Sequence, residues 1–298
     1  MPTPLSTTEL DGLELVSRGK VRDIYKVGDD LLMVATDRLS AYDQVLSPPI
    51  PDKGRVLTAL SLYWFEQLEP LVPNHLITAD VDAMPAEVRA HADVLRGRSM
   101  LVKRLQMLPI ECVARGYLVG SGWKDYLATG AVCGHTLPEG LPLSVKLDPP
   151  LYTPATKAEV GEHDENIDMA RTIEMMGEEK ARLAERITLE VYGRAREIAA
   201  ERGVVIADTK FEFGYDTEGV LTLGDEVLTP DSSRFWDASK YVEGQNQESF
   251  DKQMVRDWLD TQGWDHTPPA PMIAPEIVEK TTATYREIYR RITGTELA

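Results

Sequence analysis

One stretch of the chain, residues 207–214, restricts the fold more than any other. It reads Ala-Asp-Thr-Lys-Phe-Glu-Phe-Gly, so charged and aromatic residues alternate. Since successive side chains of a β-strand point to opposite faces, this spacing predicts a strand with Asp208, Lys210 and Glu212 on one face and two phenylalanines on the other. The aromatic face would pack against a core, which leaves the charged face for chemistry or for solvent.

The residues after this strand predict a hairpin. A turn signal, Asp-Thr-Glu-Gly at 216–219, precedes a second run of β-favouring residues. In the expected register Lys210 lies opposite Asp225 and Glu212 is diagonal to it, so three acids and one lysine share a patch. Lys210 neutralises one carboxylate, and Mg²⁺ is a natural counter-ion for the others because it takes one or two carboxylates beside water and phosphate oxygens. The alternative is a solvated hairpin face held by salt bridges.

The rest of the chain predicts a mixed α and β architecture in two lobes. Strand-like runs, amphipathic helices and Pro- and Gly-rich connections follow one another without the βαβ rhythm of a doubly wound sheet. We expect strands at 20–27, 31–36, 99–105 and 110–115, a strand-turn-strand at 203–228, helices at 55–69, 164–176, 179–202, 247–262 and 275–292, and a long loop or crossing between lobes at 134–156.

Composition disfavours several classes of function. The 298 residues include 32 Lys and Arg against 49 Asp and Glu, a net charge of −17, which opposes binding to nucleic acid or to anionic membranes. No apolar run reaches the length of a bilayer-spanning helix, and the first residues lack the features of a signal peptide. The only cysteines, Cys112 and Cys133, cannot form a disulfide framework or a zinc site alone. We therefore expect a cytoplasmic protein.

Two further motifs have the composition of a phosphate site. The basic turn at 17–23, Ser-Arg-Gly-Lys-Val-Arg-Asp, offers backbone N–H groups and a lysine, although on its own an exposed basic strand end explains it better. Arg115 precedes a Gly-Ser-Gly turn at 120–122 that suits a phosphomonoester, although spacing alone favours a flexible loop with a surface arginine. The acids at 161–166 match the cap of a following helix.

Several longer stretches are motifs too long to resemble a protein family by chance. They are Ser17–Lys20, TDRLSAYD at Thr36–Asp43, IPDKGRVLT at Ile50–Thr58, PIECVARGYLVGSG at Pro109–Gly122, TPATKAEVGEHDEN at Thr153–Asn166, IADTKFEFG at Ile206–Gly214, GDEVLTPDSSRFW at Gly224–Trp236, and Ser249–Trp258. Together they resemble the SAICAR synthetase (phosphoribosylaminoimidazole-succinocarboxamide synthase) family of purine biosynthesis, in family order over nearly the whole chain. The length is similar to that of the longer branch of the family, in which single-subunit enzymes are known.

The resemblance implies an ATP-dependent ligase that joins carboxyaminoimidazole ribonucleotide (CAIR) to L-aspartate and releases ADP and phosphate, through an acyl phosphate. It implies a two-lobed α+β fold related to kinase and ATP-grasp architectures, with mainly antiparallel sheets, flanking helices and ATP between the lobes. We expect a mainly β, nucleotide-covering lobe over residues 1–108 and an α+β lobe with the metal hairpin and substrate sites over 109–298. The partners would be small molecules only, and the protein a monomer.

The resemblance also implies roles for individual residues. Those on the ATP side are Gly19, Lys20 and Arg22 at the phosphates, Arg104, Leu105 and Met107 at adenine, and Glu111. Those on the ribonucleotide side are Arg115, Ser121 and Arg234 at its phosphate, and Asp208 and Lys210 near its imidazole and carboxylate. The remaining ones are Glu212 and Asp225 as Mg²⁺ ligands, and Lys157, His163 and Asp164 in a region implicated with aspartate.

The implied chemistry follows from charge. A carboxylate acylates poorly, and ATP converts it to an acyl phosphate that the aspartate amine attacks, so cationic groups must gather several anions. Asp208 is a candidate general base, and equally it orients Lys210. One alternative is a kinase-like phosphotransferase acting on a small molecule, against which the absence of a His-Arg-Asp catalytic-loop signature counts. Another is a nucleotide-binding regulatory module without turnover.

Overall fold

A computed structural model describes residues 3–157 and 165–297. Contacts within the chain divide it into two compact units. Unit 1 consists of Met1–Tyr63, His75–Arg104 and Phe250–Ala298, and unit 2 of Trp64–Asn74 and Leu105–Ser249. Helices and antiparallel sheets make up both units, which confirms the expected α+β class. The expected division at residue 108 stays a prediction, and the chain crosses between these units also at 249–250.

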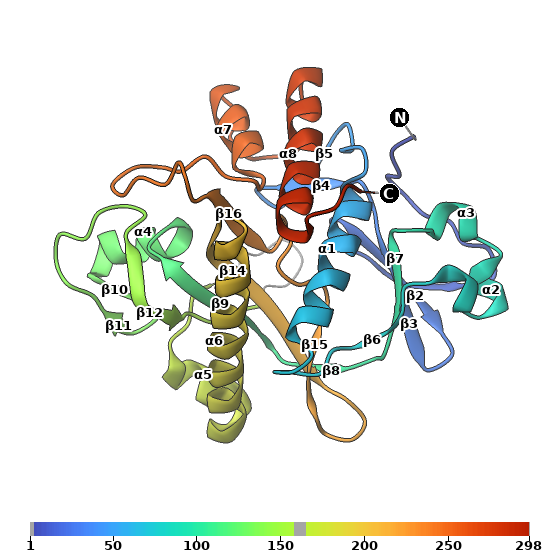
Figure 1. The fold of residues 1–298 in the computed structure, drawn as a ribbon, viewed down its shortest axis with the longest axis horizontal. Coiled ribbons are helices and arrows are strands. Elements are labelled where there is room, and N and C mark those ends of the chain that lie inside the picture. Colours follow the sequence, from blue (N-terminus) through green and yellow to red (C-terminus); the bar gives the residue numbers. More distant parts are fainter. Residues whose placement is uncertain (1–2, 158–164, 298) are drawn as a thin grey trace. The chain divides into compact units, whose positions relative to one another are not determined.

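Unit 1 is built on a five-stranded antiparallel sheet in the order β1-β2-β3-β7-β6 (Figure 1). Its strands are β1 (Glu14–Arg18), β2 (Arg22–Val27), β3 (Asp30–Ala35), β6 (Leu76–Thr78) and β7 (Ser99–Val102). The β2–β3 hairpin closes in two residues, because Gly28 accepts the left-handed φ of 60°. Buried side chains of β2, β3 and β7 pack against the short helices η1 (Val81–Ala83), α2 (Ala86–Arg89) and α3 (Ala92–Leu95).

Three longer helices involve unit 1. Helix α1 (Lys53–Leu68) begins in unit 1, ends in unit 2 and confirms the helix expected at 55–69. Leu57, Leu60 and Trp64 recur at helical spacing along it and are buried. Helix α8 (Pro275–Thr293) starts with a proline at its first turn and ends at Gly294 in the left-handed conformation. The third helix is α7 (Gln253–Thr261). The unit also contains a hairpin of β4 (Leu39–Ala41) and β5 (Gln44–Leu46).

Unit 2 is built on a seven-stranded sheet with β9 (Ile110–Tyr117) and β14 (Val204–Tyr215) at its centre. Helix α6 (Glu178–Glu201) lies across these strands (Figure 1). Helix α6 can approach β9 closely because Gly116 has no side chain, since a Cβ there would lie 1.9 Å from the Tyr192 hydroxyl. That hydroxyl donates to the Ile206 carbonyl at 2.7 Å. The remaining strands are β8 (Gln106–Met107), β12 (Lys146–Tyr152), β13 (Ala155–Thr156), β15 (Leu221–Gly224) and β16 (Ser233–Asp237).

The expectation of a loop at 134–156 was wrong in part. This stretch contains β12 and β13, which pair with β9, and β11 (His135–Thr136), which pairs with β10 (Ala131–Val132). The two prolines at 149 and 150 are tolerated because β12 is an edge strand with a register shift between Lys146 and Leu151.

Two helices are shorter than expected. Helix α5 (Met169–Met176) begins only after Asp168, whose carboxylate caps it by accepting from the Arg171 amide at 2.8 Å, instead of near residue 164. Helix α7 begins at Gln253 instead of 247, because the Gln247 side chain donates to the Val242 carbonyl and holds that segment in a turn.

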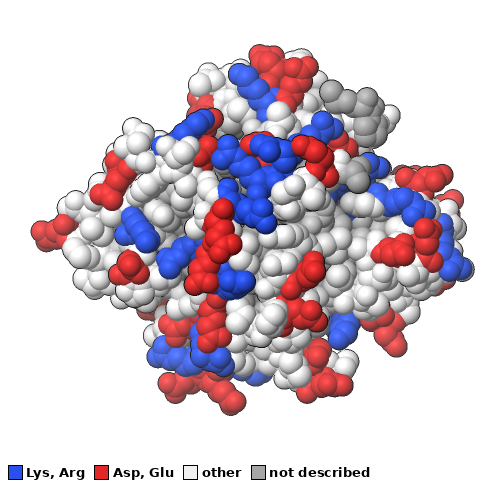
Figure 2. All heavy atoms as spheres, in the orientation of Figure 1, with Lys and Arg blue, Asp and Glu red and all other residues white. Residues whose placement is uncertain are grey.

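The surface carries both signs of charge. On the face shown in Figure 2, acidic side chains are widespread and basic side chains lie among them. Within the described part of the chain, no helix is long and apolar enough to cross a bilayer.

Candidate active-site residues

The alternation expected along β14 is present. Phe211 and Phe213 are fully buried on one face, whereas Asp208, Lys210 and Glu212 each make ion pairs with side chains from other segments of unit 2. All three occupy alternate positions of one strand, so they follow one another at steps of about 7 Å. The charged face therefore forms a row of three ion-pair groups.

The first group joins two arginines to Asp208. Arg115 on β9 and Arg234 on β16 both pair with Asp208 in the strand register, from opposite sides of β14. Their guanidinium groups donate to the same Asp208 oxygen, Oδ2, at 2.8 and 2.5 Å. Arg115 also donates from Nε to the Thr153 hydroxyl at 2.9 Å and from Nη2 to the Ser121 hydroxyl at 2.8 Å. The structure thus brings together Arg115, Ser121, Arg234 and Asp208.

Helix α4 (Gly120–Thr129) begins at this group. Its N-cap residue is Val119, which has no polar side chain, so the first amides of the helix are left for another acceptor. The Gly-Ser-Gly sequence lets the arginines come close. A Cβ on Gly120 would lie 2.8 Å from Arg234 Nη2, and one on Gly122 would lie 3.1 Å from Arg115 Cδ. Two guanidinium groups and a helix N-terminus are the components of an anion site.

Burial lowers the pKa of Arg115 without removing its positive charge. Its side chain is almost fully buried, and the loss of hydration lowers the pKa of its guanidinium, while the Asp208 carboxylate opposes that shift. Arginine remains charged even so, because its ordinary pKa lies far above neutrality. Among Arg115, Arg234 and Asp208, positive charge therefore exceeds negative charge.

The second and third groups are balanced ion pairs. Lys210 Nζ lies 2.9 Å from a carboxylate oxygen of Glu111 on β9, and Lys157 Nζ lies 2.8 Å from Glu212 Oε2. These pairs join residues that lie far apart in the sequence, and the sequence indicated neither of them. Lys157 follows β13 and forms its ion pair with the expected metal ligand Glu212, and its expected place in the aspartate region stays a prediction.

The register expected for the β14–β15 hairpin was wrong by one residue. Glu212 pairs with Gly224, whereas the expected register, with Lys210 opposite Asp225, would place it opposite position 223. The turn is longer than the sequence indicated, because the Asp216 carboxylate accepts from the amides of both Glu218 and Val220 at 2.9 Å. Asp225 follows directly after β15 in a left-handed conformation, with φ of 54°.

Glu212 and Asp225 nevertheless fit a Mg²⁺–phosphate site of the simplest kind. Glu212 pairs with Gly224, the residue directly before Asp225, and the Glu212 side chain is 30% exposed. Mg²⁺ bound with phosphates uses one or two carboxylates and otherwise water. No cluster of three or more His, Cys, Asp or Glu residues suited to a metal occurs among residues 3–157 and 165–297.

The residues expected to bind ATP lie in both units. In unit 1, Gly19 and Lys20 form the loop between β1 and β2, where the Gly19 amide donates to the Arg22 carbonyl at 2.7 Å and Lys20 forms an ion pair with Asp43. Arg104 ends a segment of unit 1. In unit 2, Met107 of β8 pairs with Gly214 of β14 and has 40% of its surface exposed. A Cβ on Gly214 would lie 2.8 Å from Leu105 Cβ, so this packing requires glycine.

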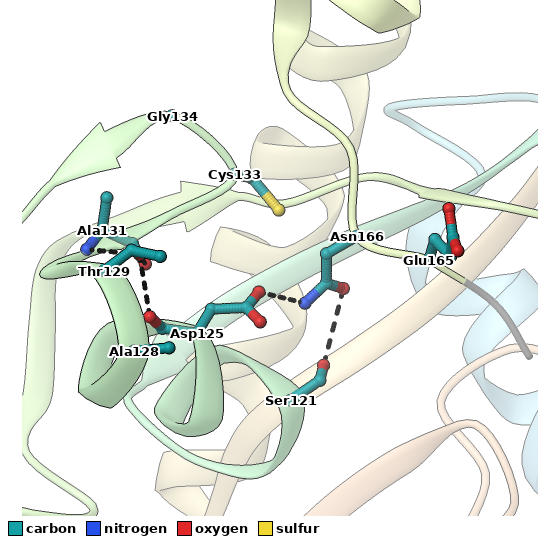
Figure 3. Close-up of a pocket in the computed structure, with 9 residues that line it drawn as sticks. All are labelled: Ser121, Asp125, Ala128, Thr129, Ala131, Cys133, Gly134, Glu165 and Asn166. Atoms are coloured by element: carbon teal, nitrogen blue, oxygen red, sulfur yellow. Dashed lines mark hydrogen bonds between the residues drawn. The ribbon is translucent and has the colours of Figure 1, made fainter.

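Unit 2 contains a pocket of about 460 Å³ (Figure 3). It shares Ser121 with the group of Arg115, Arg234 and Asp208, called the arginine group below. Ser121 and Asp125 line it from α4, and Asn166 lies between them, donating to Asp125 at 2.6 Å and accepting from Ser121 at 3.5 Å. Sequence reasoning gave no role to Asp125 or to Thr153, the partner of Arg115. Thr153 begins one of the quoted motifs, and Asp125 lies three residues after another. The expected site residues His163 and Asp164 lie outside the described residues.

Sequence comparisons relate the chain to curated proteins of the same length. The chain is 54% identical to the phosphoribosylaminoimidazole-succinocarboxamide synthase of Pelobacter propionicus over 297 residues, which is 100% of both chains. It is 54% identical to that of Geobacter sulfurreducens over 287 residues, 96% of this chain and 97% of the other.

Solved structures with a similar fold carry the same family name. SAICAR-synthase from Saccharomyces cerevisiae complexed with SAICAR superposes with a TM-score of 0.90 at 43% identity, covering 98% of this chain and 99% of that one. A SAICAR synthetase in complex with ADP has a TM-score of 0.69 at 27% identity, covering 94% and 98%. The family model described as SAICAR synthetase matches residues 15–271, and the chain belongs to the SAICAR synthetase family.

Proposed function

We propose that the chain catalyses the ATP-dependent joining of CAIR to L-aspartate, giving SAICAR, ADP and phosphate in purine biosynthesis. Family membership, curated relatives of the same length and a solved relative complexed with SAICAR support this activity. ATP as the co-substrate is supported by a relative in complex with ADP. The observation in this chain that carries the proposal is the group of Arg115, Ser121 and Arg234 at the start of α4.

The arginine group suits the phosphate of a ribonucleotide. A phosphomonoester is a dianion with several acceptor oxygens, and Arg115 and Arg234 supply charged donors while α4 supplies backbone amides. Asp208 holds both guanidinium groups in place by accepting from each on one oxygen. In this role Asp208 orients cations, which favours positioning over general-base chemistry.

The order of groups along β14 matches the order of groups in the reaction. Lys210 lies one step of about 7 Å beyond Asp208, at the reach of the imidazole and carboxylate of a ribonucleotide whose phosphate is held by Arg115. Lys210 has 42% of its side chain exposed, so its ammonium group can meet that carboxylate. Glu212 lies a further step along the strand, where the carboxylate of the ribonucleotide would receive the terminal phosphate of ATP. In this proposal, the residues for phosphate binding, for the reacting carboxylate and for the metal follow one another along β14 as Asp208, Lys210 and Glu212.

Glu212 and Asp225 would hold Mg²⁺, which when bound neutralises the charge of the ATP phosphates. Lys157 would keep the Glu212 carboxylate in position through their ion pair. Gly19, Lys20 and Arg22 would lie at the phosphates, Arg104, Leu105 and Met107 at adenine, and Glu111 would set the position of Lys210. We also place the enzyme in the cytoplasm, which agrees with its two free cysteines, and we expect a monomer.

The activity is tested by measuring ADP release with each substrate omitted in turn. The ligase requires both CAIR and aspartate for sustained ADP release. A kinase-like phosphotransferase would instead form ADP without aspartate, together with a phosphorylated hydroxyl compound, and that result would exclude the proposed reaction.

The phosphate grip is tested separately with Arg115→Ala. Loss of two charged hydrogen bonds should raise KM for CAIR by roughly 100-fold while KM for ATP changes little. Equal losses for both substrates, in a variant that unfolds as cooperatively as the wild type, would exclude Arg115 from the ribonucleotide phosphate.

A further inference from the structure

We infer that Arg38 is a positioning residue that sets the direction of the backbone amides in the loop of residues 19–21. This inference rests on the proposed function, in which that loop lies at the ATP phosphates. Arg38 belongs to the TDRLSAYD motif, and its side chain lies in unit 1 together with the loop.

One buried guanidinium holds two successive carbonyls of the loop. Arg38 is 8% exposed, and it donates from Nη2 to the Gly19 carbonyl at 2.8 Å and from Nε to the Lys20 carbonyl at 3.2 Å. The next carbonyl, that of Val21, accepts from the Thr36 amide at 3.0 Å and the Thr36 hydroxyl at 2.8 Å. Three consecutive carbonyls are therefore fixed by two residues of one motif.

Fixing the carbonyls also fixes the amides. In a planar trans peptide, the N–H points opposite to the C=O of the same unit. The carbonyls of Gly19 and Lys20 face Arg38, so the amides of Lys20 and Val21 face the other side of the loop. That arrangement gives two adjacent N–H groups a common direction, which is what an anion such as a phosphate requires.

Asp23 in turn fixes Arg38. The Asp23 carboxylate is fully buried and accepts from Arg38 Nη2 at 2.7 Å and from the Thr8 hydroxyl at 2.6 Å. A lysine at position 38 could not reach both carbonyls and Asp23 together, because an ammonium is a point charge and not a planar fork. Asp43, from the same motif, pairs with the Lys20 side chain, so the motif holds both the backbone and the side chain of the loop.

The chain offers a matched control in Arg98. It is also buried, 5% exposed, and its guanidinium pairs with the buried Asp37 at 3.0 Å and donates to the Ala35 carbonyl at 3.3 Å. Arg98 therefore has the same chemistry in the same unit, and its hydrogen bonds go to Asp37 and Ala35 instead of to the loop.

The experiment compares Arg38→Lys with Arg98→Lys. Both should lower the midpoint of thermal unfolding by similar amounts. Only Arg38→Lys should raise KM for ATP, by roughly tenfold for the loss of two carbonyl contacts, with KM for CAIR within about twofold of wild type. A purely structural role would instead change both variants, and both substrates, alike.

Lys20→Ala separates this inference from the proposed function. If neither Lys20→Ala nor Arg38→Lys changes KM for ATP, the loop does not bind ATP and both statements fall. If Lys20→Ala raises it but Arg38→Lys matches Arg98→Lys, the inference about Arg38 is wrong and the ATP site stands. Should Arg38→Lys not fold, Asp23→Asn keeps the arginine and removes the charge that orients it. That variant should raise KM for ATP alone, and an unchanged KM would overturn the inference.

Discussion

Replacing Gly120 with alanine should weaken CAIR binding without removing any charged group. Gly120 has φ of 60°, and a Cβ there would lie 2.8 Å from Arg234 Nη2 and 3.0 Å from its Cζ. The guanidinium must therefore move away from the start of α4. We expect the displaced Arg234 to lose its charged hydrogen bond to the ribonucleotide phosphate.

The size of the effect can be estimated from two separate terms. A left-handed alanine costs about 1–2 kcal/mol of folding stability. Loss of one hydrogen bond between charged groups costs about 1.5–3 kcal/mol of binding, which raises KM for CAIR roughly 10- to 150-fold. KM for ATP should change little, since none of the groups displaced belongs to the proposed ATP site.

Gly130→Ala, at the opposite end of the same helix, is the control. Gly130 also has a positive φ, 72°, but a Cβ there meets nothing within 4 Å. It should lose similar stability in thermal unfolding while keeping the wild-type KM for CAIR. If the two variants show the same KM in steady-state assays, the placement of Arg234 at the ribonucleotide phosphate is refuted.

Three further predictions follow from single contacts. Asp225→Asn should abolish turnover while the unfolding curve stays that of wild type, and near-normal turnover would remove the metal assignment. Gly116→Ala should cost about 1–3 kcal/mol in denaturant unfolding, because its Cβ would lie 1.9 Å from the Tyr192 hydroxyl, and adding Tyr192→Phe should recover part of the loss. Burial raises the pKa of the Asp23 carboxyl, but hydrogen bonds from Arg38 and Thr8 together outweigh it and keep that pKa below 3.8. This stabilisation is complete above pH 3.8 and lost at lower pH, so Asp23→Asn should flatten the acid limb of a plot of unfolding midpoint against pH.

Local periodicity made the main elements predictable. The alternation in 207–214 identified β14, and the burial of Phe211 and Phe213 confirms the face assignment. The spacing of Leu57, Leu60 and Trp64 likewise identified α1. Such patterns depend on the period of one element and need no knowledge of its neighbours.

Contacts between distant residues were not predictable in the same way. Lys157 and Glu212 are 55 positions apart, and nothing local to either residue indicates the other. The hairpin register depended on an Asp216 side chain that binds two amides, which lengthens the turn by one residue. The family motifs marked Arg38 by position alone, and only its hydrogen bonds to Gly19 and Lys20 give it a physical role.

The central claim is that the carboxylate of the ribonucleotide becomes an acyl phosphate. It is tested most directly with CAIR that carries ¹⁸O in both carboxylate oxygens, turned over with ATP and aspartate in unlabelled water. Attack of the amine on an acyl phosphate leaves one labelled oxygen in the new amide and transfers the other to inorganic phosphate. Mass spectrometry should therefore find one ¹⁸O atom in each product, and phosphate without label would contradict the account.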